Sequence, residues 1–364
     1  MTEAGQQRNF LKRLRENKGA TFGLIVIGVS LLVAIFAYLI APDNTPYANR
    51  MILEIGGRKP GNHQQFLLIK KQGQVFRDNW LSDFFSGKPD RYDYVPIDRY
   101  QYLSDSLIAW KYIDEGLDDK VSFYYPASLR QENDKYQIVT KTFWLGTDKY
   151  GRDILSRLLV GVRVSLGVGL VTVIISLTLG VFLGAVAGYF GGKIDELIMW
   201  FINIIWSIPT LLLVFAITLV LGKGFWQVFV AIGLTMWVNV ARIARGQMLG
   251  VRELEYVEAA RALGFSSPRI IFRHILPNIM GPILVVAASN FASAIIIESG
   301  LSFLGIGVQP PQPSWGLMIK ENYNFIITHN PVLALAPGLA IMLLVLAFNL
   351  LGNGLRDALD VKGR

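Results

Sequence analysis

The sequence lacks cysteine altogether and contains only three histidines in 364 residues. The absence of cysteine excludes disulfide bonds, thiol nucleophiles, cysteine-ligated zinc and iron–sulfur clusters from this chain. The histidines are scattered, which argues against a histidine metal cluster. Charged residues are also scarce at 17%, whereas hydrophobic residues make up 52%. This composition is too apolar for an ordinary soluble domain and indicates several membrane spans.

A phosphate-binding loop is missing as well. The pairs Gly87-Lys88 and Gly222-Lys223 lack both the earlier glycine and the following serine or threonine that such a loop requires. No other catalytic constellation is present. The sequence therefore predicts a chain that is not an enzyme, without catalytic, cofactor-binding or metal-binding residues and without its own ATPase site.

Six apolar runs are long enough to cross about 30 Å of hydrocarbon as helices. They cover roughly residues 20–41, 164–189, 197–221, 225–244, 279–304 and 332–352. The first run is too long for a signal-peptide core, so we interpret it as an uncleaved span. Gly180 and Gly184 have the spacing that lets helix backbones approach closely. Pro209 and Pro337 each predict a kink or a less regular helix end.

The distribution of lysine and arginine predicts the orientation of these spans. Basic residues cluster in the N-terminal segment, in the segment 242–273 and in the C-terminal tail. Six spans place all three clusters on one side, which the positive-inside rule identifies as the cytoplasm. The net charge of +8 then reflects topology, and we expect no nucleic-acid partner. The segment between the first two spans lies outside, and alternating stretches up to about residue 142 predict a small α+β or strand-rich module.

Two polar residues within predicted spans are candidate pathway or gate residues, because polar groups at membrane depth usually face a bundle interior or a water-filled path. Asn290 is expected near mid-membrane, either bonding neighbouring helices or lining the path. Glu298 is expected near the outer end of its span, either as a paired interfacial carboxylate or as a gate residue.

The segment 255–278, EYVEAARALGFSSPRIIFRHILPN, interrupts the apolar pattern on the cytoplasmic side. Gly264 is suited to end a helix over 253–263 in the left-handed conformation. Ser267 and Pro268 then fit the N-cap and first position of a second helix, which Pro277 ends. The residues alone leave two alternatives: an amphipathic pair on the lipid surface, or a docking knob for a soluble partner.

This segment resembles the EAA loop of permease subunits of binding-protein-dependent ABC importers. Glu258-Ala259-Ala260, Gly264 and the Ile275-Leu276-Pro277 ending match the family spacing, and His274 resembles the peptide branch. The stretches 143–169 and 298–316 are similar to dipeptide and oligopeptide permeases, whereas Asn353 departs from the family's common aspartate. The resemblance covers 20–42 and 143–364. Residues 50–140 fall outside it, and such a long outer insertion is similar to permeases of the microcin-uptake type.

The resemblance implies an all-α polytopic membrane protein of the type I ABC importer permease fold, with about six transmembrane helices and an extracytoplasmic α+β insertion after the first. The implied organisation is a cytoplasmic basic segment 1–19, a first span 20–41, an insertion 42–142, a five-helix core 143–352 with a coupling loop at 245–278, and a cytoplasmic tail 353–364. The implied location is the bacterial cytoplasmic (inner) membrane. The residues implied to couple to an ATPase are Glu258, Ala259, Ala260, Arg261, Leu263, Gly264 and Pro277.

The implied function is a subunit of an ATP-driven importer of di- or oligopeptides. Its partners would be a second homologous permease in a heterodimer, two ABC ATPases that bind ATP-Mg, an extracytoplasmic substrate-binding protein, and membrane lipid. A peptide antibiotic or a nickel chelate remains an alternative cargo. A non-transporting membrane scaffold with an outer partner-binding module is an alternative of another class, and an intramembrane enzyme is disfavoured by the missing catalytic motifs.

Overall fold

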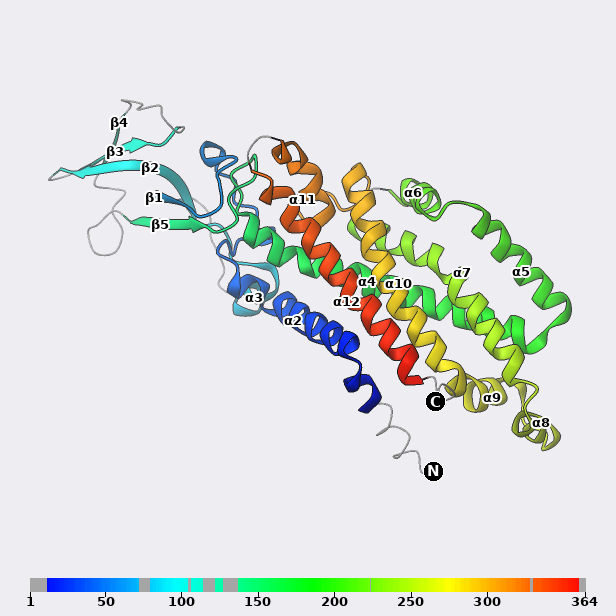
Figure 1. The fold of residues 1–364 in the computed structure, drawn as a ribbon. Coiled ribbons are helices and arrows are strands. Elements are labelled where there is room, and N and C mark those ends of the chain that lie inside the picture. Colours follow the sequence, from blue (N-terminus) through cyan, green and yellow to red (C-terminus); the bar gives the residue numbers. More distant parts are fainter. Residues whose placement is uncertain are drawn as a thin grey trace. The chain divides into compact units, whose positions relative to one another are not determined.

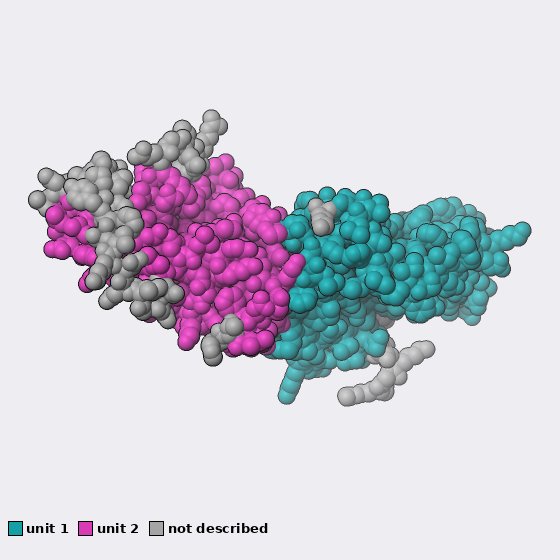
Figure 2. All heavy atoms as spheres, turned by 90° about the horizontal axis from the view of Figure 1, so that it is seen from above, with its two compact units in different colours: residues 1–31, 165–309, 340–364 teal, residues 32–164, 310–339 magenta. Residues whose placement is uncertain are grey.

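The computed structural model describes residues 12–71, 79–103, 106–113, 122–126, 137–222, 224–327 and 330–359. The chain divides into two compact units, coloured in Figure 2. One unit contains 1–31, 165–309 and 340–364, and the other contains 32–164 and 310–339. Helices dominate the described residues, and a small sheet follows the first long helix (Figure 1). The predicted fold class is therefore confirmed.

Five helices in the described part of the chain are long and apolar enough to cross a membrane, or six if one bent pair forms a span. They are α2 (Lys18–Ile40), α4 (Ile154–Phe190), α7 (Phe225–Val251), the continuous helix Ser267–Leu304 that ends with α10 (Leu276–Leu304), and α12 (Val332–Leu359). Shorter helices, α11 (Trp315–Asn322) and the 3-10 helix η5 (Tyr323–Ile326), lie between α10 and α12 in the chain.

The predicted third span, 197–221, is wrong as a single helix. It is divided into α5 (Gly192–Ser207) and α6 (Thr210–Leu221), which bend by 94° at the break. Pro209 supplies the cause, because proline has no N–H for the helix ladder and forces the preceding residue out of the helical region. Ile208 accordingly has the extended values φ −93° and ψ 130°. The sequence indicated a kink at this proline but not its size.

Glycines on α4 allow α7 to pack closely against it, as the spacing of Gly180 and Gly184 predicts. A Cβ added to Gly180 would lie 2.5 Å from Val240 Cβ, and one added to Gly184 would lie 2.4 Å from the carbonyl oxygen of Ala241. Gly188 continues this row one turn further, against Met248. The contact therefore involves the backbone itself, and a larger residue would have to push the helices apart.

Close packing also joins the first and last long helices within their shared unit. A Cβ added to Gly23 of α2 would lie 2.4 Å from the carbonyl oxygen of Ala347 in α12. Phe348 of α12 stacks on Phe291 of α10, with ring centroids 3.8 Å apart. These contacts hold α2, α12 and α10 together around apolar side chains.

The other unit contains a five-stranded antiparallel sheet in the order β4-β3-β2-β1-β5 (Figure 1). Its strands are β1 (Asn62–Lys70), β2 (Tyr92–Tyr102), β3 (Ser106–Lys111), β4 (Ser122–Pro126) and β5 (Ile138–Phe143), and α3 (Trp80–Ser86) lies between β1 and β2 in sequence. Short 3-10 helices η1 (Pro46–Ala48) and η2 (Leu53–Ile55) precede the sheet. Phe66 and Leu67 are neighbours on β1 but belong to separate buried clusters, so the sheet buries residues on both faces.

Beyond β5, the chain enters α4 through a turn that carries a buried ionic network. Asp148 accepts hydrogen bonds from the backbone N–H groups of Tyr150 and Arg152, and its Oδ2 lies 2.5 Å from Arg152 Nε. Arg152 Nη2 reaches Glu321 Oε2 of α11 at 2.6 Å. Because all three charged side chains are paired, burial of the network leaves none of these charges without a partner of opposite sign.

Candidate functional site: a helical hairpin between α7 and α10

The segment 255–278, which we call the coupling hairpin, begins with the helix α8 (Glu255–Ala262). Gly264 follows with φ +78°, in the left-handed region that favours glycine. Phe265 N–H donates to the Ala260 carbonyl at 3.1 Å and Gly264 N–H donates to the Arg261 carbonyl at 3.0 Å. These two bonds form a Schellman motif, so the helix end predicted at Gly264 is confirmed.

The second helix begins one residue earlier than the sequence predicted. Ser266 occupies the N-cap position of α9 (Ser267–Ile270), and its side chain makes no capping hydrogen bond. Ser267 is therefore the first helical residue and Pro268 the second. The predicted N-cap at Ser267 is wrong by one position, which still leaves the proline within the first turn, where its missing N–H costs nothing.

The prediction that Pro277 ends this helix is also wrong. A π-helical turn, η4 (Ile271–Ile275), joins α9 directly to α10, so Ser267–Leu304 forms one continuous helix. Pro277 cannot donate to the carbonyl four residues earlier, and the wider turn just before it accommodates this loss. The Asn278 side-chain amide also donates to the His274 carbonyl at 2.7 Å.

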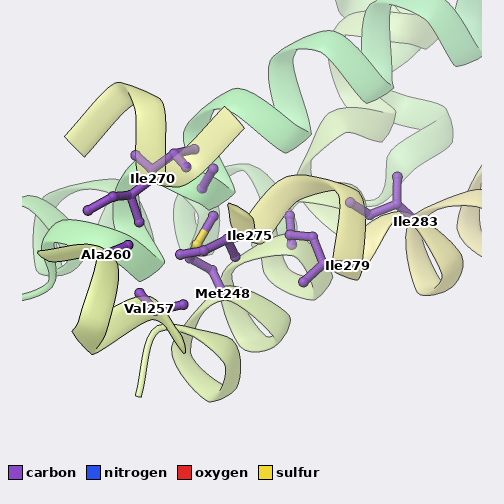
Figure 3. Close-up of a cluster of buried hydrophobic side chains, with 10 residues drawn as sticks. Met248, Val257, Ala260, Ile270, Ile275, Ile279 and Ile283 are labelled. Carbon is purple, nitrogen blue, oxygen red and sulfur yellow. The ribbon is translucent and has the colours of Figure 1, made fainter. Parts of the chain in front are cut away.

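A buried apolar cluster holds the coupling hairpin against the long helices (Figure 3). Val257 and Ala260 of α8 face inward and are 0% and 4% exposed. Their side chains meet those of Met248 from α7 and Ile275 from the π turn (Figure 3). Full burial of a valine contributes about 1.5–3 kcal/mol, so this cluster fixes α8 in place.

The remaining predicted coupling residues lie on the outer surface of the hairpin. Glu258, Ala259 and Arg261 are exposed on α8, and Pro277 is exposed at the start of α10. Leu263 is 74% exposed, and the neighbouring Gly264 is exposed as well. The Glu-Ala-Ala triplet is thus divided, with Ala260 packed inward and the other two side chains presented outward. An exposed leucine next to a tight turn is a small apolar contact point on a polar surface.

Arginines beside the hairpin have specific partners that the charge pattern alone did not reveal. Arg245 forms a bidentate pair with Asp195, in which Nη2 lies 2.5 Å from Oδ2. The guanidinium of Arg242 lies 3.8 Å from the ring centroid of Trp206. These contacts tie α7 to α5, and the sequence showed only the clustered positive charge.

The two candidate pathway residues are both buried within their unit. Asn290 is 4% exposed, and its side-chain nitrogen lies 3.4 Å from Ser176 Oγ of α4 and 3.5 Å from the Met236 carbonyl of α7. Of the two alternatives for Asn290, this geometry favours bonding between helices. Glu298 is 0% exposed and accepts a 2.6 Å hydrogen bond from Ser302 Oγ, which itself accepts from Val308 N–H at 3.0 Å. Glu298 thereby anchors the turn that follows α10.

A cavity of about 190 Å³ lies beside the bend between α5 and α6. Asn239 and Thr235 of α7, Ser293 of α10 and Thr210 of α6 supply its polar lining, and Trp206 belongs to its apolar lining. Asn239 was not a predicted pathway residue, although an amide within a span is the sequence signal that could have identified it.

The helical hairpin and long helices define the class of this protein. Residues 180–362 match the family of binding-protein-dependent transport system inner membrane components, and the chain belongs to this family. Residues 5–54 match a second family, the N-terminal transmembrane domain of oligopeptide transport permease C.

Curated relatives agree with both matches. The oligopeptide transport system permease protein OppC of Bacillus subtilis is 41% identical over 225 residues, which cover 62% of this chain and 73% of that protein. The glutathione transport system permease protein GsiD of Pectobacterium atrosepticum is 43% identical, covering 60% of this chain and 72% of that protein. A di/tripeptide transport permease, DppC of Pseudomonas aeruginosa, is 44% identical with the same coverage.

Proposed function

We propose that this chain is a permease subunit of an ATP-driven importer that moves di- or oligopeptides across the bacterial inner membrane. The family membership and the relatives named for oligopeptide, di/tripeptide and glutathione transport support this cargo. The observation that carries the proposal is the coupling hairpin, whose apolar side is buried and whose Glu258, Ala259, Leu263 and Gly264 are exposed.

The hairpin suits the transmission of force from a separate protein. Val257 and Ala260 anchor α8 to a cluster that includes residues of α4, α7 and α10. A displacement applied at the exposed Leu263 and Glu258 would therefore move the long helices rather than a loose loop. In this mechanism, ATP binding closes two partner ATPases and draws the hairpins of two permease subunits together. The equilibrium then shifts toward the outward-facing state, which requires a differential of several kcal/mol.

In the proposed topology both termini and the coupling hairpin are cytoplasmic, and the sheet-containing insertion is extracytoplasmic. The basic segments that flank the spans support this orientation. ATP-Mg binds to the partner ATPases, and this chain contributes no ATPase site and no cofactor of its own. An extracytoplasmic binding protein delivers the peptide.

A second, homologous permease completes the translocation path. The cavity beside the α5–α6 bend supports this part of the proposal, since Asn239 and Ser293 offer hydrogen-bonding groups in a lining of both polar and apolar side chains. One chain supplies one wall of the path, and the partner supplies the other.

The direct test is reconstitution of the full complex in proteoliposomes. The labelled dipeptide and the binding protein are added outside the vesicles, and ATP is enclosed inside them, on the side that the ATPases face. Uptake should require the ATPases, the binding protein and this chain together. Mass spectrometry of ligand captured by the cognate binding protein identifies the cargo. A nickel chelate or a peptide antibiotic as the sole captured ligand would contradict the di- or oligopeptide assignment.

A further inference from the structure

The unit that contains the sheet has an open cavity of about 290 Å³, whose lining shares no residue with the coupling hairpin or with the bend between α5 and α6. This volume is at the lower end of the roughly 300–1,000 Å³ typical of small-molecule sites. Its lining combines four charged side chains with apolar ones: Asp43, Arg50, Lys141 and Asp153, together with Pro42, Ile52, Phe143 and Trp144.

Asp153 presents an unused acceptor at this cavity. It precedes α4 and is only 4% exposed. Ser156 donates to its Oδ2 from both the backbone N–H, at 2.9 Å, and the hydroxyl group. Within the described part of the chain, Oδ1 is buried and has no hydrogen-bond partner. Capping α4 therefore uses one carboxylate oxygen, and the described residues supply no donor for the other.

Lys141 presents an unpaired cation at the same cavity. It lies on β5, and its Nζ is 4.7 Å from the ring centroid of Tyr94. Among the described residues no carboxylate lies within ion-pairing distance of this ammonium. Burial, reinforced by the neighbouring Arg50, lowers the pKa of Lys141 to about 8. At neutral pH the ammonium group is charged but has lost part of its hydration, and an anionic ligand group would compensate for that loss.

The other two charged groups, Arg50 and Asp43, are paired with each other and bonded to neighbouring residues of the same unit. Arg50 binds Asp90 through Nε at 3.0 Å and Nη2 at 2.9 Å, and its Nη1 lies 3.4 Å from Asp43. Asp43 also accepts from the backbone N–H groups of Thr45 and Arg50. Among the described residues, the cavity is therefore left with one buried carboxylate oxygen that has no hydrogen-bond partner and one partly buried ammonium group that has no ion-pair partner.

We propose that this cavity binds a small zwitterion, an amino acid or dipeptide, with the ligand ammonium on Asp153 Oδ1 and the ligand carboxylate on Lys141 Nζ. A net-neutral ligand with both charges matches both groups, whereas a simple anion or cation would leave one of them without a partner of opposite charge. An extended dipeptide spans at most about 7 Å, which suits a cavity of this size. Phe143 and Trp144 offer apolar surface to its side chains.

Binding is measured on the purified full chain in nanodiscs, without ATPases or binding protein, so the result does not depend on the proposed transport function. Isothermal titration at pH 7 uses Ala-Ala, Ala-Ala amide and N-acetyl-Ala-Ala, with acetate as the simple anion. Lys141→Met and Asp153→Asn remove one charge each and preserve side-chain bulk. Lys149→Met is the matched lysine control, because its Nζ also lies over a tyrosine ring, at 4.9 Å from the Tyr150 centroid. Asp93→Asn, at an exposed aspartate outside the cavity, is the carboxylate control.

Ala-Ala should bind one site, and either blocked peptide should bind at least about tenfold more weakly, since each loses a charged hydrogen bond. Lys141→Met should bind Ala-Ala and its amide equally, and Asp153→Asn should bind Ala-Ala and its acetylated form equally. The two control variants should bind like the unmodified chain. The proposal is overturned if Ala-Ala does not bind, if acetate binds as well as Ala-Ala, or if both blocked peptides bind the unmodified chain like Ala-Ala.

Discussion

Arg152 and Glu321 are separated by 169 residues in the sequence, yet their Nη2 and Oε2 atoms lie 2.6 Å apart. The side chains are only 1% and 10% exposed, and Asp148 completes the network on the other side of the guanidinium. Arg152→Met would leave Asp148 buried without its cation, and would leave Glu321 with only Arg157, whose Nη2 lies 3.5 Å from Oε2. We expect a loss of about 3–5 kcal/mol of stability, seen as a lower midpoint of thermal unfolding.

Arg99→Met is the control for that substitution, because Arg99 is exposed and contacts the ring of Trp110 at 4.6 Å. Its midpoint should stay close to that of the unmodified chain. If the two variants unfold at the same temperature, the buried network does not stabilise this unit.

Gly184→Ala should destabilise the packing of α4 on α7. The new methyl group would lie 2.4 Å from the Ala241 carbonyl oxygen, so one helix must move, at a cost of about 1–3 kcal/mol. Gly246→Ala on α7 places the same methyl group where nothing lies within 4 Å. That control should be neutral or slightly stabilising, because alanine favours a helix by up to about 1 kcal/mol. Equal midpoints for the two variants would refute the close contact.

Substitutions at Gly264 separate the conformation of the hairpin turn from its contact surface. Asparagine and aspartate both tolerate a positive φ better than other residues, and nothing lies within 4 Å of a Cβ at this position. Gly264→Asn should therefore retain peptide-stimulated ATPase activity and uptake. Gly264→Asp adds a charge at the proposed contact and should uncouple ATP hydrolysis from uptake while the chain still inserts. Normal uptake by Gly264→Asp would argue against docking at this turn.

The low pKa of Lys141 predicts a pH-dependent stability. Its pKa is about 8 in the folded chain and about 10.4 in an unfolded one, so the unfolded chain binds more protons between these values. Stability therefore rises with pH from about 8 to 10, because the cost of burying the charge is lost as the ammonium deprotonates. The charged groups around it are Arg50, Asp43, Asp90 and Asp153, and Tyr94 faces it as well.

Thermal midpoints of the unmodified chain and of Lys141→Met, measured across this range, isolate the contribution of the lysine. The difference between the two should shrink as pH rises from 8 to 10. Affinity for Ala-Ala should fall over the same interval, since both Lys141 and the peptide's own ammonium group lose their protons there. A difference in midpoint that does not change with pH would contradict the assignment.

The sequence predicted those structural features that depend on one residue or on a short stretch of neighbouring residues. The spacing of Gly180 and Gly184 predicted a close helix contact, and Gly264 predicted a left-handed helix end; both are confirmed. Pro209 indicated a kink, but the 94° bend also depends on how α6 packs against α7. The continuation of the helix through Pro277 was not predicted. A π turn accommodates the hydrogen bond that the proline cannot donate, and the residue types of the segment do not indicate such a turn.

Features that depend on distant residues could not be predicted. Two features arise only when segments far apart in the sequence meet: the network of Arg152 with Glu321, and the cavity that Arg50 lines together with Lys141. The coupling roles of the outward-facing hairpin residues stay predictions, since their proposed partners are other proteins, and the gate role of Glu298 stays a prediction as well.

The measurement that tests the central claim most directly compares Leu263→Asp with Leu53→Asp in the reconstituted importer. Both leucines are exposed, at 74% and 69%, but only Leu263 lies on the coupling hairpin. Leu263→Asp should abolish ATP-driven dipeptide uptake and co-purification of the ATPases without changing the unfolding midpoint, while Leu53→Asp should transport normally. Normal uptake by Leu263→Asp, with the ATPases still bound, would contradict the account.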